Sequence, residues 1–313
     1  VGRIAASRPL TLLILIVLLS LYMTLRFPDN FPTAYNIGAV LLNAAQQGIL
    51  VVGMMLLMIA GFFDLSIGAT LALAGVVAAI AGTQLGFPPL LAALCAILFG
   101  ARAGFVNGFI TPRLGINALI TTLATMTIFR GVTQLLSGTG ISPISDDYAK
   151  LGQTVFLGIE PPFWVMVIIV AVGTWAVAQT RFFRQYYFIG GNPRAAQLSG
   201  IKVERLTLIA FVLMGALAGL AGMLGAARLN AAVVTAGIGV ELNVITAAVL
   251  GGASLKGGEG TVVGGVLGVM LIALVQNALI INGVNVFWQG IIIGLVLLLA
   301  VSFDPLKRTG KES

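Results

Sequence analysis

The chain has 313 residues, of which 59% are hydrophobic and 9% are charged, and its mean hydropathy is +1.08. A soluble domain carries roughly a quarter charged residues, so this composition excludes a water-soluble globular protein and requires lipid around much of the surface. The net charge is +7, and the basic residues lie between apolar runs. This placement indicates that they set the membrane orientation and do not bind nucleic acid. One cysteine and no histidine exclude internal disulfides, Cys-rich metal sites and histidine acid–base chemistry.

Long apolar runs predict an all-α, polytopic integral membrane protein. We predict ten spans, at 10–26, 38–61, 67–82, 89–110, 118–136, 162–179, 206–227, 241–252, 261–281 and 288–303. The first lacks a small-x-small cleavage site and is interpreted as an uncleaved span. The eighth is too short to cross alone, so AAVVTAGIGV before it is expected to form part of a broken or re-entrant segment. Such backbone persists at membrane depth only inside protein or beside a wet cavity.

The arginines and lysines of the loops predict the orientation. Ten crossings place both termini on one side, together with Arg3, Arg8, Arg113, Arg181, Arg184, Arg194, Lys202, Arg205, Lys256, Lys307, Arg308 and Lys311. The other side has only Arg26, Lys150 and Arg228, and an external loop, 137–161, that carries Asp146, Asp147 and Glu160. Arg102 and Arg130 fall within or at the ends of spans and are not counted. Both termini are therefore predicted to be cytoplasmic, in a single transmembrane domain covering 1–313.

No sequence motif indicates catalysis. A phosphate-binding loop, G-x-x-x-x-G-K-[ST], is absent, and the nearest glycine-rich stretch, GGASLKGGEGT at 251–261, lacks its Gly-Lys-Ser/Thr end. Nucleophile–base pairs and clusters of metal-binding residues are also missing. We therefore predict no enzyme activity, no bound cofactor and no metal. Within that stretch, GGASLKGG shares Gly, Leu and Gly with GFFDLSIG at 61–68, a weak sign of an internal repeat of the kind found in transporters.

Asp64, between the second and third spans, is the most conspicuous charge near membrane depth. A charge in that position costs ~2.5–3.5 kcal/mol on insertion scales, so it usually faces a cavity or a partner. Two interpretations stay open. Asp64 or Ser66 can cap the helix that follows by accepting hydrogen bonds from free N–H groups. Alternatively, Asp64 belongs to a gate or to the path of the solute.

Amides and hydroxyls also occur in or near the spans, namely at Asn107, Asn117, Thr121, Thr122, Thr125, Thr127, Gln276 and Asn277. Their ordinary role is interhelical hydrogen bonding, worth ~0.6 kcal/mol each. The functional alternative is a modestly polar path for an uncharged, hydroxyl-rich solute. An ion or proton path needs a relay of carboxylates or histidines, of which the spans contain almost none. The candidate path or gate residues are Asp64, Ser66, Asn107, Asn117, Thr122 and Asn277.

The stretch GGNPRAAQLSGI, residues 190–201, interrupts the apolar pattern. Asn192 is expected to be an N-cap, with Pro193 in the first helical turn and Gly200 at the end. A helix this short is unstable alone, so something must hold it. It is either a solvated loop with one helical turn or a docking element, in which two alanines let a partner surface approach closely.

Several motifs together resemble the permease subunit of the ribose-type sugar importers, which are ATP-binding-cassette (ABC) transporters. They are GFFDLSIGATLALAG (61–75), GFVNGFITPRLGINALITTLATMTIFRG (104–131), TRFFRQYYFIGGNPRAAQLSGI (180–201), VLGGASLKGGEGTVVGGVLGVMLIALVQNAL (249–279) and NVFWQGIIIGLVLLLAV (285–301). The resemblance extends over almost the whole chain. One departure is GFFDLSIG, since the family's usual form is GGIDLSVG and Phe62 and Phe63 replace Gly and Ile.

The resemblance implies a division of labour in the bacterial inner membrane. A dimer of permeases, identical or different, would translocate a monosaccharide such as ribose. A cytoplasmic ABC ATPase subunit would use ATP and Mg²⁺, and a periplasmic sugar-binding protein would deliver the sugar. The loop 180–205 would hold the coupling helix, Asn192 to Ile201. Within that helix Ala195, Ala196, Gly200 and Ile201 match the family's Ala-Ala-x-x-x-Gly-Ile core, while Arg194 stands where many ABC permeases have Glu. The alternative is a stand-alone ion- or proton-coupled secondary carrier.

Overall fold

A computed structural model describes residues 8–285, 288–296 and 298 of the chain, and this part contains helices and no named strand. The helices are α1 (Arg8–Arg26), α2 (Ala34–Ile59), α3 (Ile67–Thr83), α4 (Pro89–Leu114), α5 (Ala118–Ser137), α6 (Asp146–Gln153), α7 (Pro161–Gln179), α8 (Arg181–Gly191), α9 (Pro193–Leu198), α10 (Val203–Leu229), α11 (Val240–Leu250) and α12 (Val262–Ile281). The predicted all-α class is confirmed for these residues.

Within the described residues, seven helices are long and apolar enough to cross a bilayer: α1, α2, α4, α5, α7, α10 and α12. The chain is therefore a multi-pass membrane protein. Two further predicted spans correspond to the shorter apolar helices α3 and α11. The tenth, 288–303, is helical at 288–296, and its end lies outside the described residues. The count of ten crossings and the side of the termini stay predictions.

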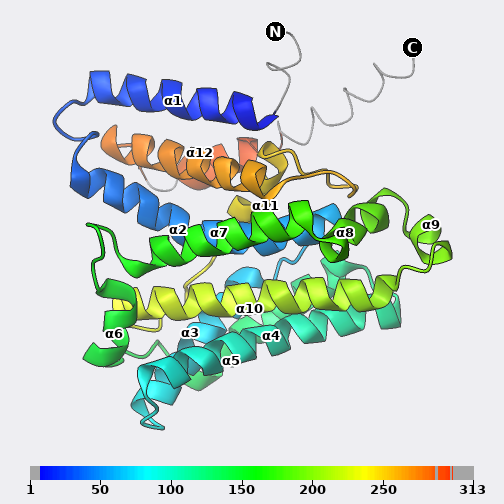
Figure 1. The fold of residues 1–313 in the computed structure, drawn as a ribbon. Coiled ribbons are helices and arrows are strands. Elements are labelled where there is room, and N and C mark those ends of the chain that lie inside the picture. Colours follow the sequence, from blue (N-terminus) through cyan, green and yellow to red (C-terminus); the bar gives the residue numbers. More distant parts are fainter. Residues whose placement is uncertain (1–7, 286–287, 297, 299–313) are drawn as a thin grey trace.

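The long helices run side by side, with α6 at one end of the bundle and α8 and α9 at the other (Figure 1). These ends are named the α6 end and the α9 end. Helix α10 is central and packs on α2, α3 and α4. Its contact with α4 is a backbone contact, because a Cβ on Gly104 would meet the Phe211 carbonyl and one on Gly100 would meet the Gly215 carbonyl. Small residues let membrane helices approach in this way, where no hydrophobic effect holds them together.

Two breaks interrupt the helical spans. The first, residues 60–66, separates α2 from α3, and the second, residues 230–239, separates α10 from α11. The breaks converge where a Cβ on Gly68 would run into the Gly237 carbonyl. The short α11 and the irregular segment before it match the broken span that the sequence predicts.

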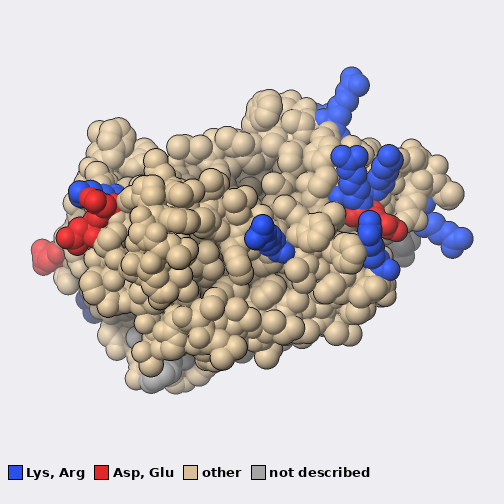
Figure 2. Space-filling model, turned by 90° about the horizontal axis from the view of Figure 1, so that it is seen from below, with Lys and Arg blue, Asp and Glu red and all other residues tan. Residues whose placement is uncertain are grey.

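Charge separates along the bundle. On the face seen in Figure 2, most Lys and Arg side chains gather at the α9 end and most acidic side chains at the α6 end. Arg113 and Arg205 line one surface groove beside the coupling loop, and the Arg8 side chain lies against Gly252. At the α6 end, Arg228 instead pairs with Glu160 at 2.7 Å. Among the described residues, Arg113 and Arg205 therefore share one end, as the charge count predicts, whereas Arg3, Lys307, Arg308 and Lys311 lie outside the described residues.

Candidate coupling and translocation sites

Helix α9 forms the protruding part of the α9 end (Figure 1). The Asn192 side chain accepts a hydrogen bond from the Ala195 N–H at 3.0 Å, and Pro193 occupies the first helical turn. Gly200 follows the helix at φ +85°, a left-handed conformation that glycine adopts without strain. The Ile201 N–H then donates to the Ala196 carbonyl at 3.1 Å. The capped helix predicted from the sequence is present, and its docking role stays a prediction.

The two alanines of α9 face different surroundings, which corrects one expectation. Ala195 is exposed, as are Arg194 and Pro193, but only 4% of Ala196 is exposed, within the hydrophobic core. The close approach expected of both alanines is therefore available only to Ala195. Leu198, which the sequence pattern did not single out, is 85% exposed. The only sequence feature that could have indicated an exposed contact residue here is a leucine beside the polar end of a short helix.

A backbone junction lies directly beside the coupling helix. A Cβ on Gly190, near the end of α8, would meet the Ile59 carbonyl and the Gly258 amide. That amide donates to the same Ile59 carbonyl at 2.8 Å, and Gly257 lies against Gly61. The two stretches of the weak internal repeat, 61–68 and 251–258, thus meet at the base of α9.

Asp64 is buried in a hydrogen-bonded network, with 2% of the residue exposed. One carboxylate oxygen accepts from the Ser66 N–H at 2.8 Å and from the Ser66 hydroxyl at 2.6 Å. The Asn107 amide of α4 donates to Ser66 Oγ at 2.9 Å and lies 3.3 Å from the carboxylate. On α5 the Thr125 hydroxyl donates to the Asn107 side-chain oxygen at 2.8 Å. The network joins the first break to α4 and α5, and Asp64 binds Ser66, the residue before α3, whose side chain makes no capping hydrogen bond to the helix.

The remaining candidate path residues are Asn117, Thr122 and Asn277. Asn117 caps α5, because its side chain accepts from the Leu119 N–H at 2.8 Å. The buried Thr122 hydroxyl donates to the Ala118 carbonyl of its own helix at 2.8 Å. Asn277 on α12 pairs with Asn36 on α2, its amide donating at 2.6 Å. The structure therefore brings Asp64, Ser66 and Asn107 together and places Thr122 beside them, since the Thr125 hydroxyl also donates to the Thr122 carbonyl at 3.2 Å. Asn117 and Asn277 lie elsewhere.

Arg130 of α5 holds the second break. Its Nη1 donates to the Val234 carbonyl at 2.6 Å and to the Ala236 carbonyl at 2.9 Å. Near the start of α11, the Glu241 carboxylate accepts from the Gly239 N–H at 3.2 Å. Arg130 lies within or at the end of a predicted span, so the loop charges that predict the orientation do not include it. The sequence indicates such a role only by placing an arginine inside an apolar run, because a charge at membrane depth needs partners. Irregular backbone can provide them, since its carbonyls are free to accept hydrogen bonds.

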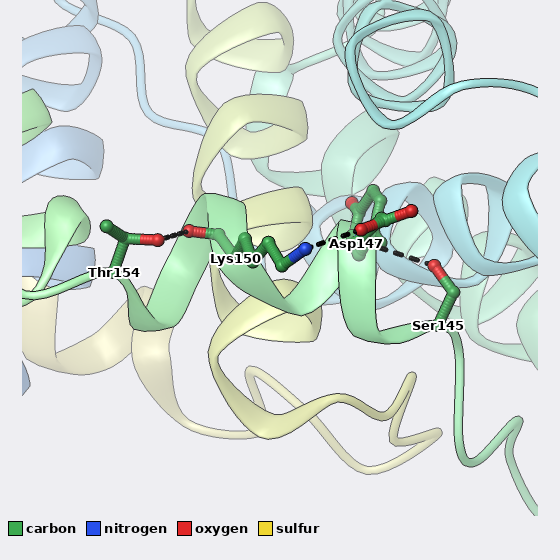
Figure 3. A network of polar contacts seen from close by, with 5 residues as sticks. Ser145, Asp147, Lys150 and Thr154 are labelled. Carbon is green, nitrogen blue, oxygen red and sulfur yellow. Dashed lines mark hydrogen bonds and ion pairs between the residues drawn. The ribbon is translucent and has the colours of Figure 1, made fainter.

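Helix α6 carries the acidic surface of the α6 end (Figure 3). The Ser145 hydroxyl accepts from the Tyr148 N–H at 3.1 Å, and the Lys150 ammonium binds Asp147 at 2.7 Å. That hydrogen bond, and then the lysine charge, lower the pKa of the Asp147 carboxyl. The buried Tyr148 hydroxyl donates to the Met223 carbonyl of α10 at 3.2 Å. The acidic side chains are thereby presented on a helix fixed to the bundle.

Known proteins resemble this chain over nearly its full length. A family model described as "Branched-chain amino acid transport system / permease component" matches residues 36–301. The ribose import permease protein RbsC of Escherichia coli (strain K12) is 38% identical, over 95% of this chain and 94% of that protein. RbsC of Bacillus subtilis (strain 168) is 38% identical, over 95% and 92%. The L-arabinose transport system permease protein AraH of Escherichia coli (strain K12) is 36% identical, over 92% and 88%.

No solved structure matches the chain, so the assignment depends on the family model and these relatives. The family model covers α2 to α12, which include the two breaks and the coupling loop. The chain belongs to this family of transport-system permease components.

Proposed function

We propose that the chain is the permease subunit of an ATP-driven ABC importer in the bacterial inner membrane, and that it translocates a monosaccharide, ribose or a similar sugar. Relatives named as ribose and arabinose permeases support the substrate class. The observation that carries the coupling role is α9, a capped helix that exposes Leu198 beyond the bundle. A permease without its own phosphate-binding loop needs a contact of this kind with an energy source.

The two ends of the bundle then face two partners. The basic α9 end lies in the cytoplasm and binds the ABC ATPase subunit, which uses ATP and Mg²⁺. The acidic α6 end faces the periplasm and receives the sugar-binding protein, whose approach charge complementarity would steer. A second permease copy, identical or different, and the lipid bilayer cover the apolar outer faces.

The glycine junction at Gly190 is the proposed route from α9 into the membrane. Because Gly190, Ile59 and Gly258 touch through backbone atoms, no flexible side chain can absorb a displacement of α9 there. Movement of the coupling helix would reach the end of α2 and, through residues 62–64, the Asp64 network. This supports alternating access driven from the cytoplasmic side.

Co-purification tests the coupling role. Leu198→Glu, made in the full chain with the ATPase of its own system, is expected to weaken ATPase binding by about 10- to 100-fold, because burying a leucine contributes about 1.5–3 kcal/mol. Leu157→Glu is the control, since Leu157 is 75% exposed at the opposite end. Equal ATPase recovery with both variants would remove α9 as the contact.

Uptake tests the transport function. Liposomes containing the permease, its ATPase and its binding protein should accumulate labelled ribose or arabinose only with ATP. Uptake by the permease alone, driven by an ion gradient without ATP, would identify a secondary carrier and overturn the proposal.

A further inference from the structure

A cavity of about 290 Å³ lies inside the single chain, between α2, α3, α10 and the second break. Its wall includes Asn43, Gln46, Gly75, Gly222, Arg228 and Thr235. Arg228 near the end of α10 and Pro162 at the start of α7 also line it, which places its mouth toward the α6 end. The volume is at the lower edge of the range of roughly 300–1,000 Å³ that small-molecule pockets occupy.

We propose that this cavity is a solute site within one permease subunit and that it binds one uncharged, hydroxyl-rich molecule of monosaccharide size. The inference rests on the proposed function and deepens it. It assigns binding to α2, α10 and the second break, and assigns no solute contact to the buried Asp64 network. Each copy in a dimer would then hold its own solute.

The polar groups of the wall suit hydroxyl groups, which both donate and accept hydrogen bonds. The Gln46 amide nitrogen donates to the Ala221 carbonyl at 3.3 Å, which leaves the side-chain oxygen available. In the part of the chain that the structure describes, no hydrogen bond involves the Thr235 hydroxyl or the backbone N–H groups of Val233 and Thr235. The wall therefore offers donors and acceptors from neutral groups.

Along the second break, Val233 and Thr235 line the cavity and Val234 between them does not. Val233 is 39% exposed, whereas its neighbour Val234 is 7% exposed and directs its carbonyl to Arg130. Thr235 is again exposed, and the Ala236 carbonyl again binds Arg130. This alternation gives the segment a side held by α5 and a side that faces the solute.

The remaining wall sets the size of the solute. A Cβ on Gly222 would meet the Leu71 carbonyl, and a Cβ on Gly75 would lie 3.2 Å from the Gly222 carbonyl. Helices α3 and α10 therefore touch behind the cavity and close it. Leu42, Leu71 and Ala72 provide apolar surface for the C–H faces of a sugar ring. Arg228, which lines the cavity, is held by the partly exposed Glu160 and adds a further hydrogen-bond donor.

Direct binding to the purified full-length permease in lipid nanodiscs, without ATPase or binding protein, tests the site. Saturation-transfer NMR and calorimetry would use D-ribose and L-arabinose as probes, with maltose as an oversized sugar. The wild type is expected to bind a monosaccharide saturably and not maltose. Gln46→Met and Thr235→Val should each weaken that binding by about 2- to 10-fold, as expected for loss of one hydrogen bond.

The matched control variants carry the same changes, glutamine to methionine and threonine to valine, at positions outside the cavity. Gln134→Met and Thr127→Val alter exposed positions on α5, where the Thr127 hydroxyl donates only to the Leu123 carbonyl of its own helix. Both should bind sugar as the wild type does. If one cavity variant does not fold, the other decides the result.

Two outcomes would overturn the site: no saturable monosaccharide binding by the wild type, or equal affinity in the cavity and control variants. Either outcome with intact ATP-dependent uptake by the complete system would leave the proposed function standing. Loss of ATP dependence in that uptake assay would instead remove the proposed function itself.

Discussion

The two breaks in the helical spans are stabilised in opposite ways. At the first, residues 60–66, the Asp64 carboxylate accepts the Ser66 N–H at the start of α3. At the second, residues 230–239, the Arg130 guanidinium donates to two carbonyls before α11. At the first break an anion accepts from a backbone N–H, and at the second a cation donates to backbone carbonyls of the loop, so each charge satisfies backbone groups that no helix pairs.

The surroundings of the breaks differ as well. Asp64, Ser66 and Asn107 are all buried and bonded to one another, so the first break is held from several sides. The second has one long side chain from α5 behind it and a cavity in front of it. We infer that the first break acts as a fixed element and that the second is the one able to adjust to a solute.

Asp64→Ala is expected to have the largest effect, because it removes the acceptor at the centre of the buried network. It leaves the Ser66 N–H and the Ser66 hydroxyl without that acceptor, and each unsatisfied buried group costs about 1–3 kcal/mol. We expect a loss of about 3 kcal/mol in unfolding free energy, measured as thermal unfolding in detergent. Asp146→Ala, at the exposed start of α6, is the control. Equal melting of the two variants would show that the network contributes no stability.

Gly68→Ala tests the point where the breaks meet. The added Cβ would collide with the Gly237 carbonyl and approach the Glu241 carboxylate, so the two breaks must separate. Overpacking of this kind costs about 2 kcal/mol, and ATP-dependent uptake should fall with it. Gly131→Ala on α5 is the matched control, because nothing lies within 4 Å of its added Cβ. Unchanged melting and uptake in Gly68→Ala would mean that the breaks are independent.

Arg130→Met should affect stability less and solute handling more. It removes two hydrogen bonds from a charged donor to the second break. Both are only partly buried, so water replaces part of the loss and we expect a total cost of about 1.5 kcal/mol. Without these hydrogen bonds Val233 and Thr235 lose their orientation, so the sugar concentration for half-maximal uptake should rise while membrane insertion is retained. Arg130→Lys, which keeps the charge and donors, should recover part of the uptake. Failure of lysine to improve on methionine would argue against a positioning role.

Much of the fold and part of the site follow from the sequence. Apolar runs predict the spans because lipid demands them, and the Asn192–Pro193 pair with Gly200 predicts α9 because helix ends need local partners. Asp64 and Ser66 were identifiable as a possible cap for the same reason. These features depend on residues close together in the chain or on the solvent around it.

Features set by long-range packing were not accessible in that way. The orientation of Ala196 depends on the core that covers a six-residue helix, and periodicity does not define a face over so short a length. The partners of Arg130 lie more than a hundred positions later and are backbone carbonyls. Every residue has a carbonyl, so the pattern of side chains does not predict which ones Arg130 contacts. Gly190 needs its missing Cβ only because the backbones of two distant loops converge there.

Asp147→Asn should have the smallest effect on stability. It compares an exposed carboxylate with the buried carboxylate of Asp64. Asp147 is also a carboxylate with a close partner, Lys150 at 2.7 Å, but both side chains are largely exposed, so water replaces the lost contact. The hydrogen bond to Lys150 lowers the folded-state pKa of Asp147. Its stabilisation is therefore present above the ordinary carboxyl pKa of about 4 and is lost as the pH falls through the lowered folded value. Melting of wild type and variant should differ slightly at pH 7 and converge in acid; a difference as large as that of Asp64→Ala would show that burial does not distinguish the two carboxylates.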